Sequence, residues 1–470
     1  MPCHYHSSRS IIFVLLLLWS LPVWAAPGLL ILDNPLRRSF TGFASSLAVV
    51  GDIDGDGVSD YLVGAYEHYW QENLNQGRAF VFSGQSGKIL WILDLPTPYQ
   101  GAAFGSAVAA AGDVNQDGVP DLLVGAFGQG ESGQAFVFSG KTGKLLYTMQ
   151  APRRQSGAGF GWAVTALGDL TGDGVPELVV GAFAQEGRGR VFVFDGQNGK
   201  LLRTLAPPSL SESMTFGWSV AAAGDLDQDG SPDILVGAPY TPVGELSVQG
   251  RVFAFSGRTG ELLYALTDPF PRAGEGFGWR VASGGDLNGD GVPDILIGAP
   301  YKSGEGTRSE GAAFVFNGAD GSLLFSLRNP ALSKSYSGFG LMVAQTPDIN
   351  GDGVPEILVS APYQKVDLDH VQGEVFLFDG HDGRHLSTFD DPSPHQGATF
   401  GYAAVSPGDV NGDQIPDFAV GAAGQAIMDK VAVGRVYVFL SQSQRAEAAE
   451  EGRLRLGRTE EPHVGTRPLP

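Results

Sequence analysis

Short apolar runs separated by glycine-rich polar segments recur from about residue 28 to residue 440. One unit contains FGSAVAAAGD from Phe104, DLLVGAF from Asp121, and GQAFVFSGKTGKLLYTM from Gly133 to Met149. The first two segments have the length and composition of strands, and the third is typical of two strands joined by a tight turn. Runs such as Val191 to Phe194 are apolar at nearly every position, as in strands buried on both faces. Helical periodicity is absent from the units, so the pattern predicts four strands per unit.

An acidic nonapeptide recurs once in each unit, between the first two predicted strands. The copies share the form D-x-[D/N/T]-x-D-[G/Q]-x-[P/S]-[D/E], and successive copies start 56 to 62 residues apart. A fixed period of this size is the signature of a repeat architecture. The seven copies begin at Asp52, Asp113, Asp169, Asp225, Asp286, Asp348 and Asp409.

The chemistry of the nonapeptide predicts a Ca²⁺ loop. Side-chain oxygens at positions 1, 3, 5 and 9 and a carbonyl at position 7 match the oxygen shell that this cation prefers. The glycine at position 6 allows the positive φ of a sharp wrap. An EF-hand needs a glutamate at position 12, where this chain has Val63 in the first copy and Val124 in the second, so the loops are not EF-hands. Ordinary Asp/Asn/Gly turns are the alternative interpretation, which seven copies in register disfavour.

The predicted ligands follow from the alignment of the seven copies. They are Asp52, Asp54, Asp56, Val58 and Asp60; Asp113, Asn115, Asp117, Val119 and Asp121; Asp169, Thr171, Asp173, Val175 and Glu177; Asp225, Asp227, Asp229, Ser231 and Asp233; Asp286, Asn288, Asp290, Val292 and Asp294; Asp348, Asn350, Asp352, Val354 and Glu356; and Asp409, Asn411, Asp413, Ile415 and Asp417. We expect up to seven Ca²⁺. The third and seventh sites should be the weakest or empty, because Thr171 is a neutral ligand and Gln414 replaces the glycine.

Seven four-stranded units have one well-known closed arrangement, an all-β seven-bladed β-propeller. An open solenoid is the rival. The seventh unit stops after Phe439 without a fourth strand, whereas Gly28 to Pro35 resembles the fourth-strand segments GELLYALTDP from Gly260 and GSLLFSLRNP from Gly321. A ring in which the N-terminal strand completes the last blade explains both observations and removes exposed sheet edges at the seam.

These motifs resemble the FG-GAP repeat family, whose best-known members are the N-terminal propellers of integrin α subunits. A Phe-Gly pair stands nine residues before six of the seven loops, and the first repeat has Phe43-Ala44 instead. Gly-Ala-Pro follows the second strand at Gly237 and Gly298, with variants in the other repeats. The acidic loop in all seven repeats departs from the integrin pattern and is closer to bacterial FG-GAP proteins or to the propeller of GPI-specific phospholipase D.

The ends and the charge suggest an exported protein. Residues 1–25 have the features of a signal peptide, with Arg9, an apolar core from Ile11 to Leu18 and a small-residue cleavage site ending at Ala25. An uncleaved anchor is the alternative, but the apolar stretch is shorter than the ~20 residues that a spanning helix needs. We therefore assign 1–25 to a signal peptide, 26–441 to the propeller and 442–470 to a mobile charged tail, and expect a secreted or periplasmic protein without a transmembrane helix in the mature chain.

The net charge of −21 includes 23 acids at predicted ligand positions, so seven Ca²⁺ would cancel two thirds of it. No basic stripe is present, which makes nucleic acid an unexpected partner. The only cysteine, Cys3, lies in the predicted signal, so stability must come from the ring and its metals instead of disulfides.

Variable connections between the second and third strands should gather on the face opposite the acidic loops, where we expect a protein or glycan ligand. Candidate residues of this ligand face are Tyr66, Tyr69, Trp70, Tyr240, Tyr301 and Tyr363. Integrin propellers use this face for recognition, which the resemblance implies here. Trp162, Trp218, Trp279 and Tyr402 follow the Phe-Gly pairs and could line the same surface, although their strand parity favours packing between blades.

Nothing in the sequence indicates an enzyme. The histidines of the repeats occur without metal-ligand spacing and are expected to be solvated loop residues: His68, His370, His381, His385 and His395. Nucleophile elbows, zinc-binding helices and phosphate loops are absent. The sequence predicts a secreted calcium-binding interaction module for adhesion or protein recognition. A lectin-like propeller and a structural scaffold without a small ligand are the alternatives.

Overall fold

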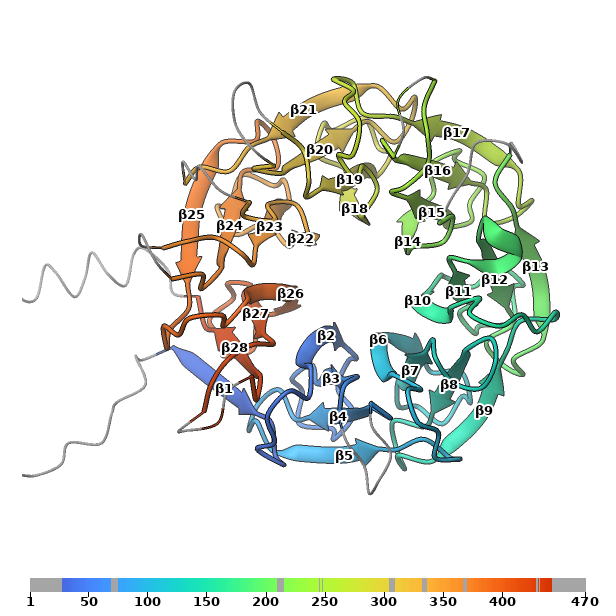
Figure 1. Ribbon diagram of the computed structural model, residues 1–470, viewed down its shortest axis with the longest axis vertical. Coiled ribbons are helices and arrows are strands. Elements are labelled where there is room, and N and C mark those ends of the chain that lie inside the picture. Colours follow the sequence, from blue (N-terminus) through green and yellow to red (C-terminus); the bar gives the residue numbers. More distant parts are fainter. Residues whose placement is uncertain are drawn as a thin grey trace, which may run out of the picture.

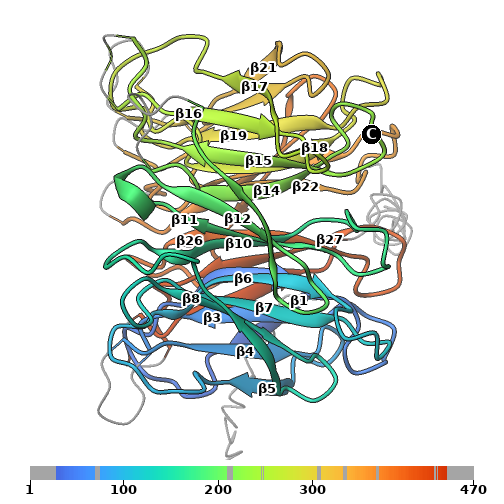
Figure 2. The ribbon, with the colours of Figure 1, turned by 90° about the vertical axis from the view of Figure 1, so that its right-hand side faces the viewer.

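The protein folds into seven four-stranded antiparallel sheets arranged as blades around a central channel (Figure 1). The computed structural model describes residues 28–441, apart from 69–74, 209–214, 245, 247, 304–308, 332–335, 367–369, 428–429 and 431. The predicted signal, the predicted tail, Tyr69 and Trp70 lie outside the described residues. The seven-bladed propeller and the four strands per unit are confirmed. Seen from the side, the ring is a disc with connections on both faces (Figure 2).

Each blade runs from an inner first strand at the channel to an outer fourth strand. The first three blades are β2 (Phe43–Val49), β3 (Tyr61–Ala65), β4 (Arg78–Phe82) and β5 (Ile89–Leu93); β6 (Phe104–Gly112), β7 (Asp121–Ala126), β8 (Gln134–Phe138) and β9 (Leu145–Met149); and β10 (Phe160–Ala166), β11 (Leu178–Ala182), β12 (Arg190–Phe194) and β13 (Leu201–Leu205). A 3₁₀ turn, η1 (Gln185–Gly187), precedes β12.

The remaining blades repeat this order. They are β14 (Ser219–Gly224), β15 (Asp233–Ala238), β16 (Arg251–Phe255) and β17 (Leu262–Leu266); β18 (Arg280–Gly285), β19 (Asp294–Ala299), β20 (Ala312–Phe316) and β21 (Leu323–Leu327); β22 (Val343–Thr346), β23 (Glu356–Ala361), β24 (Glu374–Phe378) and β25 (His385–Asp390); and β26 (Phe400–Gly408), β27 (Asp417–Ala422), β28 (Arg435–Phe439) and β1 (Leu29–Asp33).

The N-terminal strand closes the ring, as the sequence predicted. β1 pairs antiparallel with β28, from Leu29 opposite Phe439 to Asp33 opposite Arg435. The Arg435 Nε donates to Asp33 Oδ1 at 2.7 Å, which ties the two chain ends together by a second means. The last blade therefore has the four strands of its neighbours, and its outer edge is built from residues more than 400 positions away in the sequence.

The hydrophobic core lies between adjacent blades, and the Phe-Gly pairs are part of it. Phe104 of β6 is fully buried, with its ring 5.6 Å from Phe136 and 5.9 Å from Phe138, and it also packs on Leu62 and Val81 of the preceding blade. The apolar character of the second and third strands at nearly every position follows from this burial on both faces.

The glycine of each pair makes room for the neighbouring blade. Gly105 has φ +85°, and a Cβ there would lie only 2.4 Å from the carbonyl oxygen of Arg78. Glycine is thus required both for the backbone conformation and for the close approach. In the first blade Ala44 takes this position at φ 67°, so the ring tolerates one departure.

The direction of the strands gives the disc two chemically different faces. The first strand ends at the acidic nonapeptide and the second strand returns from it, so the seven nonapeptides share one face, which we call the loop face. The connections from the second to the third strands lie on the other face, which we call the aromatic face. Within the described part of the chain, no helix has the length and hydropathy needed to cross a membrane.

Candidate functional site

The seven acidic loops fold in the same way around the carboxylate at position 1. In every loop the N–H of position 6 donates to this carboxylate, at 2.8 Å from Gly57 to Asp52 in the first loop and at 2.6 Å from Gln414 to Asp409 in the seventh. The N–H of position 5 donates to it as well in six loops, for example Asp56 to Asp52 at 3.1 Å. The loop backbone therefore surrounds the carboxylate at position 1, and the acids at the other positions lie around it.

The carboxylate at position 9 is buried beneath each loop. Asp60 is completely inaccessible and accepts hydrogen bonds from the Ile53 N–H at 2.7 Å and the Gly84 N–H at 2.8 Å. Its counterparts are Asp121, Glu177, Asp233, Asp294, Glu356 and Asp417. Burial raises the pKa of Asp60 to about 6 and that of Glu356 to about 7, with backbone hydrogen bonds opposing the shift. Such carboxyls favour the neutral form unless a positive charge lies beside them.

Two positions of each loop adopt left-handed backbone conformations. Position 6 has φ between +82° and +91° in the six loops where it is glycine, as the sequence analysis expected, and +71° at Gln414. Position 4 is also left-handed in all seven loops, including Gln116 at 57° and Gln228 at 58°. The sequence analysis missed position 4, although five of the seven residues there are glycine.

Convergent carboxylates make three of the loops fit a hard cation. The groups in which three carboxylate oxygens lie within 4.8 Å of one another are Asp52, Asp54 and Asp60; Asp225, Asp227 and Asp229; and Asp348, Asp352 and Glu356. Like charges at this separation repel unless a cation lies between them. Among the described residues, the second, third, fifth and seventh loops lack such a triplet, and their ligand assignments remain predictions together with those of the carbonyls at position 7.

Replacing Gln414 by glycine should stabilise the protein. A residue with a Cβ loses roughly 1 kcal/mol or more in the left-handed region, and glycine relieves this at a smaller entropic cost. We expect Gln414→Gly to raise the free energy of unfolding by about 0.5 kcal/mol, measured by urea denaturation. Gln414→Ala is the matched control, because it shortens the side chain but keeps the Cβ; equal effects of the two substitutions would contradict the explanation.

The described residues of the predicted ligand face are half-buried on the aromatic face. Tyr301 and Tyr363 lie over Gly276 and Gly338, glycines that precede the first strand of the same blade, and Tyr66 lies over Gly42 in the same way. Tyr240 packs on two tryptophan rings. These tyrosines are partly structural, and each side chain keeps an exposed part.

The tryptophans after the Phe-Gly pairs join these rings into one layer, which we call the aromatic collar. Trp162, Trp218 and Trp279 lie in sequence around the channel, with centroids 4.7 and 4.9 Å apart. Contacts of 4.9 to 6.1 Å link them to the other members of the collar, which are Phe127, Phe183, Tyr240, Tyr301, Tyr336 and Tyr363. The tryptophans thus pack between blades, as parity favoured, and also line the channel.

A β-bulge explains why the alternation of side chains along the strand predicted that the tryptophans pack between blades but did not predict that they also line the channel. In β10 Phe160 pairs with Ala182, but the next partner, Gly181, faces Ala163, so two residues of β10 are unpaired. The bulge turns Trp162 toward the axis while Phe160 stays in the core. No signal in a single sequence marks the bulge except the glycine between the two aromatic residues, which has φ +90°.

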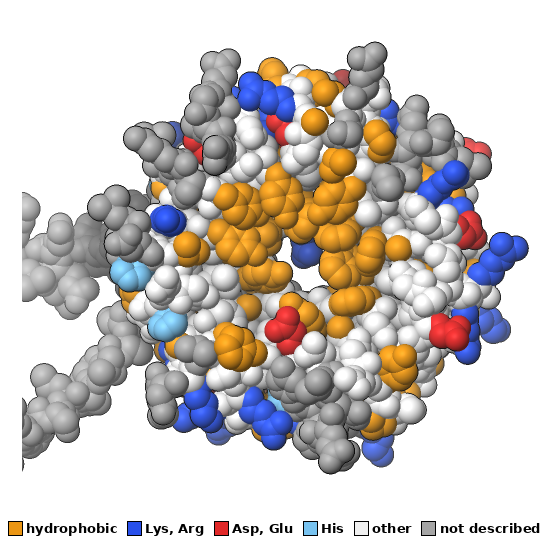
Figure 3. Space-filling view, viewed as in Figure 1, with side chains coloured by type: hydrophobic (Ala, Val, Ile, Leu, Met, Phe, Trp, Pro, Cys, Tyr) orange, Lys and Arg blue, Asp and Glu red, His pale blue; other side chains and the backbone are white. Residues whose placement is uncertain are grey.

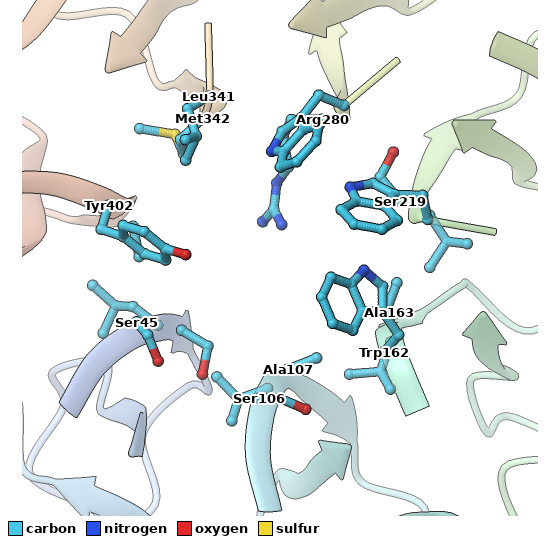
Figure 4. A pocket seen from close by; sticks show the side chains of 18 of the residues that line it. Ser45, Ser106, Ala107, Trp162, Ala163, Ser219, Arg280, Leu341, Met342 and Tyr402 are labelled. Atoms are coloured by element: carbon cyan, nitrogen blue, oxygen red, sulfur yellow. The ribbon is translucent and has the colours of Figure 1, made fainter. Parts of the chain in front are cut away.

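The collar borders the mouth of the central channel along the blades that contain β10, β14 and β18. Figure 3 shows hydrophobic side chains gathered around the hollow with a basic group at its centre, and Figure 4 shows the Arg280 side chain directed into the channel between Tyr402 and Ser219. The channel encloses about 210 Å³ and is lined by residues at the start of every first strand. The sequence analysis did not single out Arg280.

One histidine prediction is wrong. His68 is completely buried, not solvated; its N–H donates to the Ala65 carbonyl and its carbonyl accepts from the Gly77 N–H, so its backbone is held against the end of β3 and the start of β4. Burial lowers its pKa to about 4, with Arg78 and Arg38 adding to the shift. A neutral imidazole at this place has a structural role. His370, His381 and His385 are exposed, as expected.

Comparison with known proteins identifies the family. The FG-GAP-like repeat model matches residues 113–180, 169–236 and 348–420, and the FG-GAP repeat model matches 277–316, together about half of the chain. The chain belongs to the FG-GAP repeat family, and its ring is a propeller like that of the N-terminal region of integrin α subunits.

Individual relatives match over part of their length. Integrin alpha-5 of Xenopus laevis is 33% identical over 43% of this chain and 20% of its own length, and integrin alpha-4 of the same species is 28% identical over 49% and 22%. Integrin alpha-3 of Cricetulus griseus is 35% identical over 35% and 17%. The chain thus matches about a fifth of the length of these relatives. A crystal structure of BBS1N in complex with ARL6DN aligns with a TM-score of 0.49 at 12% identity, over 88% of this chain and 97% of that one.

Proposed function

We propose that this protein is an exported, calcium-stabilised propeller that recognises a protein partner through its aromatic face. The single observation that carries the proposal is the division of chemistry between the two faces: carboxylates converge on one, and a continuous layer of half-exposed aromatic rings borders the channel on the other. The similarity to integrin α subunits supports a role in adhesion or recognition. The predicted signal peptide supports export.

Calcium would be held by the oxygens at positions 1, 3, 5, 7 and 9 of the loops. The first, fourth and sixth loops have the best donor sets, because three carboxylates already converge in each. A bound ion would neutralise them and tie both ends of the nonapeptide to the hairpin turn below. The function of the metal in this proposal is structural, since it fixes the connection between the two inner strands of a blade.

Removing one ligand should remove one calcium. Asp54 is exposed and supplies a carboxylate to the triplet of the first loop, so Asp54→Ala should abolish that site without disturbing the core. Isothermal titration with Ca²⁺ should show one site fewer among those with dissociation constants of ~0.1 to 1 mM, the range of extracellular calcium modules. Glu261→Ala, an exposed acid outside the loops, should leave the number unchanged. An unchanged stoichiometry in Asp54→Ala would contradict the assignment.

Recognition of a protein is tested on the aromatic face. Trp218 contacts four other rings at the centre of the collar, so Trp218→Ala should abolish binding of a partner isolated in calcium-containing buffer from the native envelope or matrix. A glycan-binding propeller is the second candidate, because half-exposed tryptophan and tyrosine rings also suit sugar faces. Binding on a glycan array that is lost in Trp218→Ala, with no protein partner, would favour the second candidate.

A further inference from the structure

The central channel contains an isolated positive charge. Among the described residues that line the cavity, Arg280 is the only charged one, and its side chain projects into the open channel (Figure 4). Its guanidinium makes no hydrogen bond or ion pair with any residue that the structure describes. The acid Glu67 lines a separate pocket at the seam beside Tyr66. Arg280 therefore has five N–H donors and no acceptor in the described part of the chain.

The internal repeats show that the fold does not require an arginine here. Arg280 is the third residue after Phe277, and the residues at this place in the other six blades are all uncharged: Ser46, Ala107, Ala163, Ser219, Met342 and Ala403. Six blades close the same channel with small or apolar side chains. The arginine is thus an addition at one blade and not a part of the repeat.

The surroundings of Arg280 strengthen its attraction for an anion. The Arg280 side chain is exposed to the solvent inside the channel, but the seven blades that surround it displace bulk water, and this partial desolvation lowers the pKa of Arg280, although an arginine keeps its proton. A charge in such an environment interacts more strongly with an opposite charge than it would at an open surface. Ser45 and Ser106 line the same cavity with hydroxyl groups that have no partner among the described residues.

We propose that the channel mouth binds an aspartate or glutamate side chain of a protein partner, which pairs with Arg280 while the surrounding segment of the partner packs on the aromatic collar. This inference rests on the proposed recognition function and names the chemistry of the partner. A carboxylate matches the guanidinium in a bidentate geometry.

The shape and composition of the site favour a protein over a free ligand. The enclosed volume of about 210 Å³ suits one side chain and is below the ~300 to 1,000 Å³ of sites that enclose a small molecule. Tryptophan, tyrosine and arginine, the three residue types that meet here, are also those enriched among the dominant contacts of protein interfaces. The collar would exclude water around the ion pair and so form the rim of the interface.

Peptide selection tests the proposal on the full chain. Random heptapeptides displayed on phage would be selected in 1 mM Ca²⁺ against the native protein, Arg280→Gln, Arg280→Glu and the control Lys200→Glu. Lys200 is exposed in the turn after β12 on the loop face, and its substitution makes the same charge change away from the channel. Thermal melting of each variant would establish that the ring is intact.

The expected result is a set of peptides that contain an invariant acidic residue, selected by the native protein and by Lys200→Glu. Arg280→Gln should lose this preference, and Arg280→Glu should select lysine or arginine in its place. Replacing the acid of the best peptide by its amide should weaken its affinity for the native protein at least ~30-fold, as for other desolvated charge pairs. That loss should shrink to a few-fold in Arg280→Gln.

Three results would overturn the proposal. One is selection of the same peptides by all four proteins; if their binding is still lost in Trp218→Ala, the recognition function stands and only the role of Arg280 fails. The second is selection of no peptide by the native protein. The third is Arg280-dependent binding of oligogalacturonate without any peptide binding, which would assign the channel to acidic glycans.

Discussion

In calcium-free buffer the melting temperature should fall as the pH is raised from 5 to 7.5, and 1 mM Ca²⁺ should abolish this fall. The reason lies in the buried carboxyls at position 9. Burial raises the pKa of Asp60, Asp121, Asp233 and Asp294 to about 6 and that of Glu356 to about 7, whereas the unfolded chain should have values near ~4.

The sign follows from proton binding. Between pH 4 and 7 the folded protein without calcium holds more protons at these acids than the unfolded chain does, so its free energy of unfolding decreases as the pH rises. The stabilisation is complete below the unfolded pKa and is lost as the pH passes through the folded pKa. Each acid contributes roughly 1 to 3 kcal/mol, because one pKa unit corresponds to 1.36 kcal/mol.

Over the same pH range calcium stabilises the folded protein more as the pH rises, because it binds the ionised carboxylates. A site with a dissociation constant of ~0.1 mM gains about 1.4 kcal/mol at 1 mM Ca²⁺ and neutral pH. Even three or four sites would then shift the melting temperature of the ring by several degrees, at ~2 °C or more per kcal/mol. The difference between the calcium and calcium-free melting temperatures should therefore be small at pH 5 and largest at pH 7.5.

Differential scanning calorimetry of resin-stripped protein, with and without 1 mM Ca²⁺, measures this difference directly. Asp60→Asn provides the matched control, because it removes one titrating acid and one calcium ligand together. Both the fall with pH and the gain from calcium should be smaller in this variant. Parallel melting curves with and without calcium at every pH would show that the loops are ordinary Asx turns satisfied by their own N–H groups.

The sequence predicted the strands and the closure of the ring because both rest on repeated, local patterns. The apolar run of Val252 to Phe255 specifies a strand buried on both faces wherever it occurs, and seven copies of each pattern average out the exceptions. The segment from Gly28 was assigned to the last blade because its residues match other fourth strands. Its pairing with β28 shows that such a match carries long-range information.

The chemistry of the aromatic face depends on features that occur once or depend on tertiary context. The bulge at Gly161 turns Trp162 toward the axis, against simple alternation. His68 looks like a loop residue in the sequence, but it is buried, with backbone hydrogen bonds to Ala65 and Gly77 that the sequence does not reveal. Arg280 is a departure from the repeat in one blade of seven, and the significance of such a departure emerges only when the seven first strands are seen to meet at one channel.

Removing residues 28–35 should open the ring and lower the melting temperature by ~10 °C or more. The deletion exposes the outer edge of β28 and removes the buried side chains of Leu32 and Asn34. Asn34 Nδ2 donates to Thr41 Oγ1 at 2.9 Å and to the Val433 carbonyl at 3.1 Å, so its loss also leaves buried acceptors unpaired. Calorimetry measures the effect, and a synthetic peptide of residues 28–36 added in excess should restore part of the transition, since a free sheet edge accepts an added strand.

A point substitution in β1 tests whether the side-chain packing of the closing strand stabilises the ring as the packing of other fourth strands does. Leu32 lies opposite Val436, just as Leu266 lies opposite Val252 in a blade of contiguous sequence, and both leucines are almost fully buried. If the closing strand is an integral part of the last blade, Leu32→Ala should cost the same ~2 to 5 kcal/mol of unfolding free energy as Leu266→Ala. Leu202→Ala, at an outer-strand position that is 43% exposed, should cost far less. A value for Leu32→Ala close to that of Leu202→Ala would mean that the first strand frays from the ring in solution, and that the propeller is held closed by the contacts between its first and last blades alone.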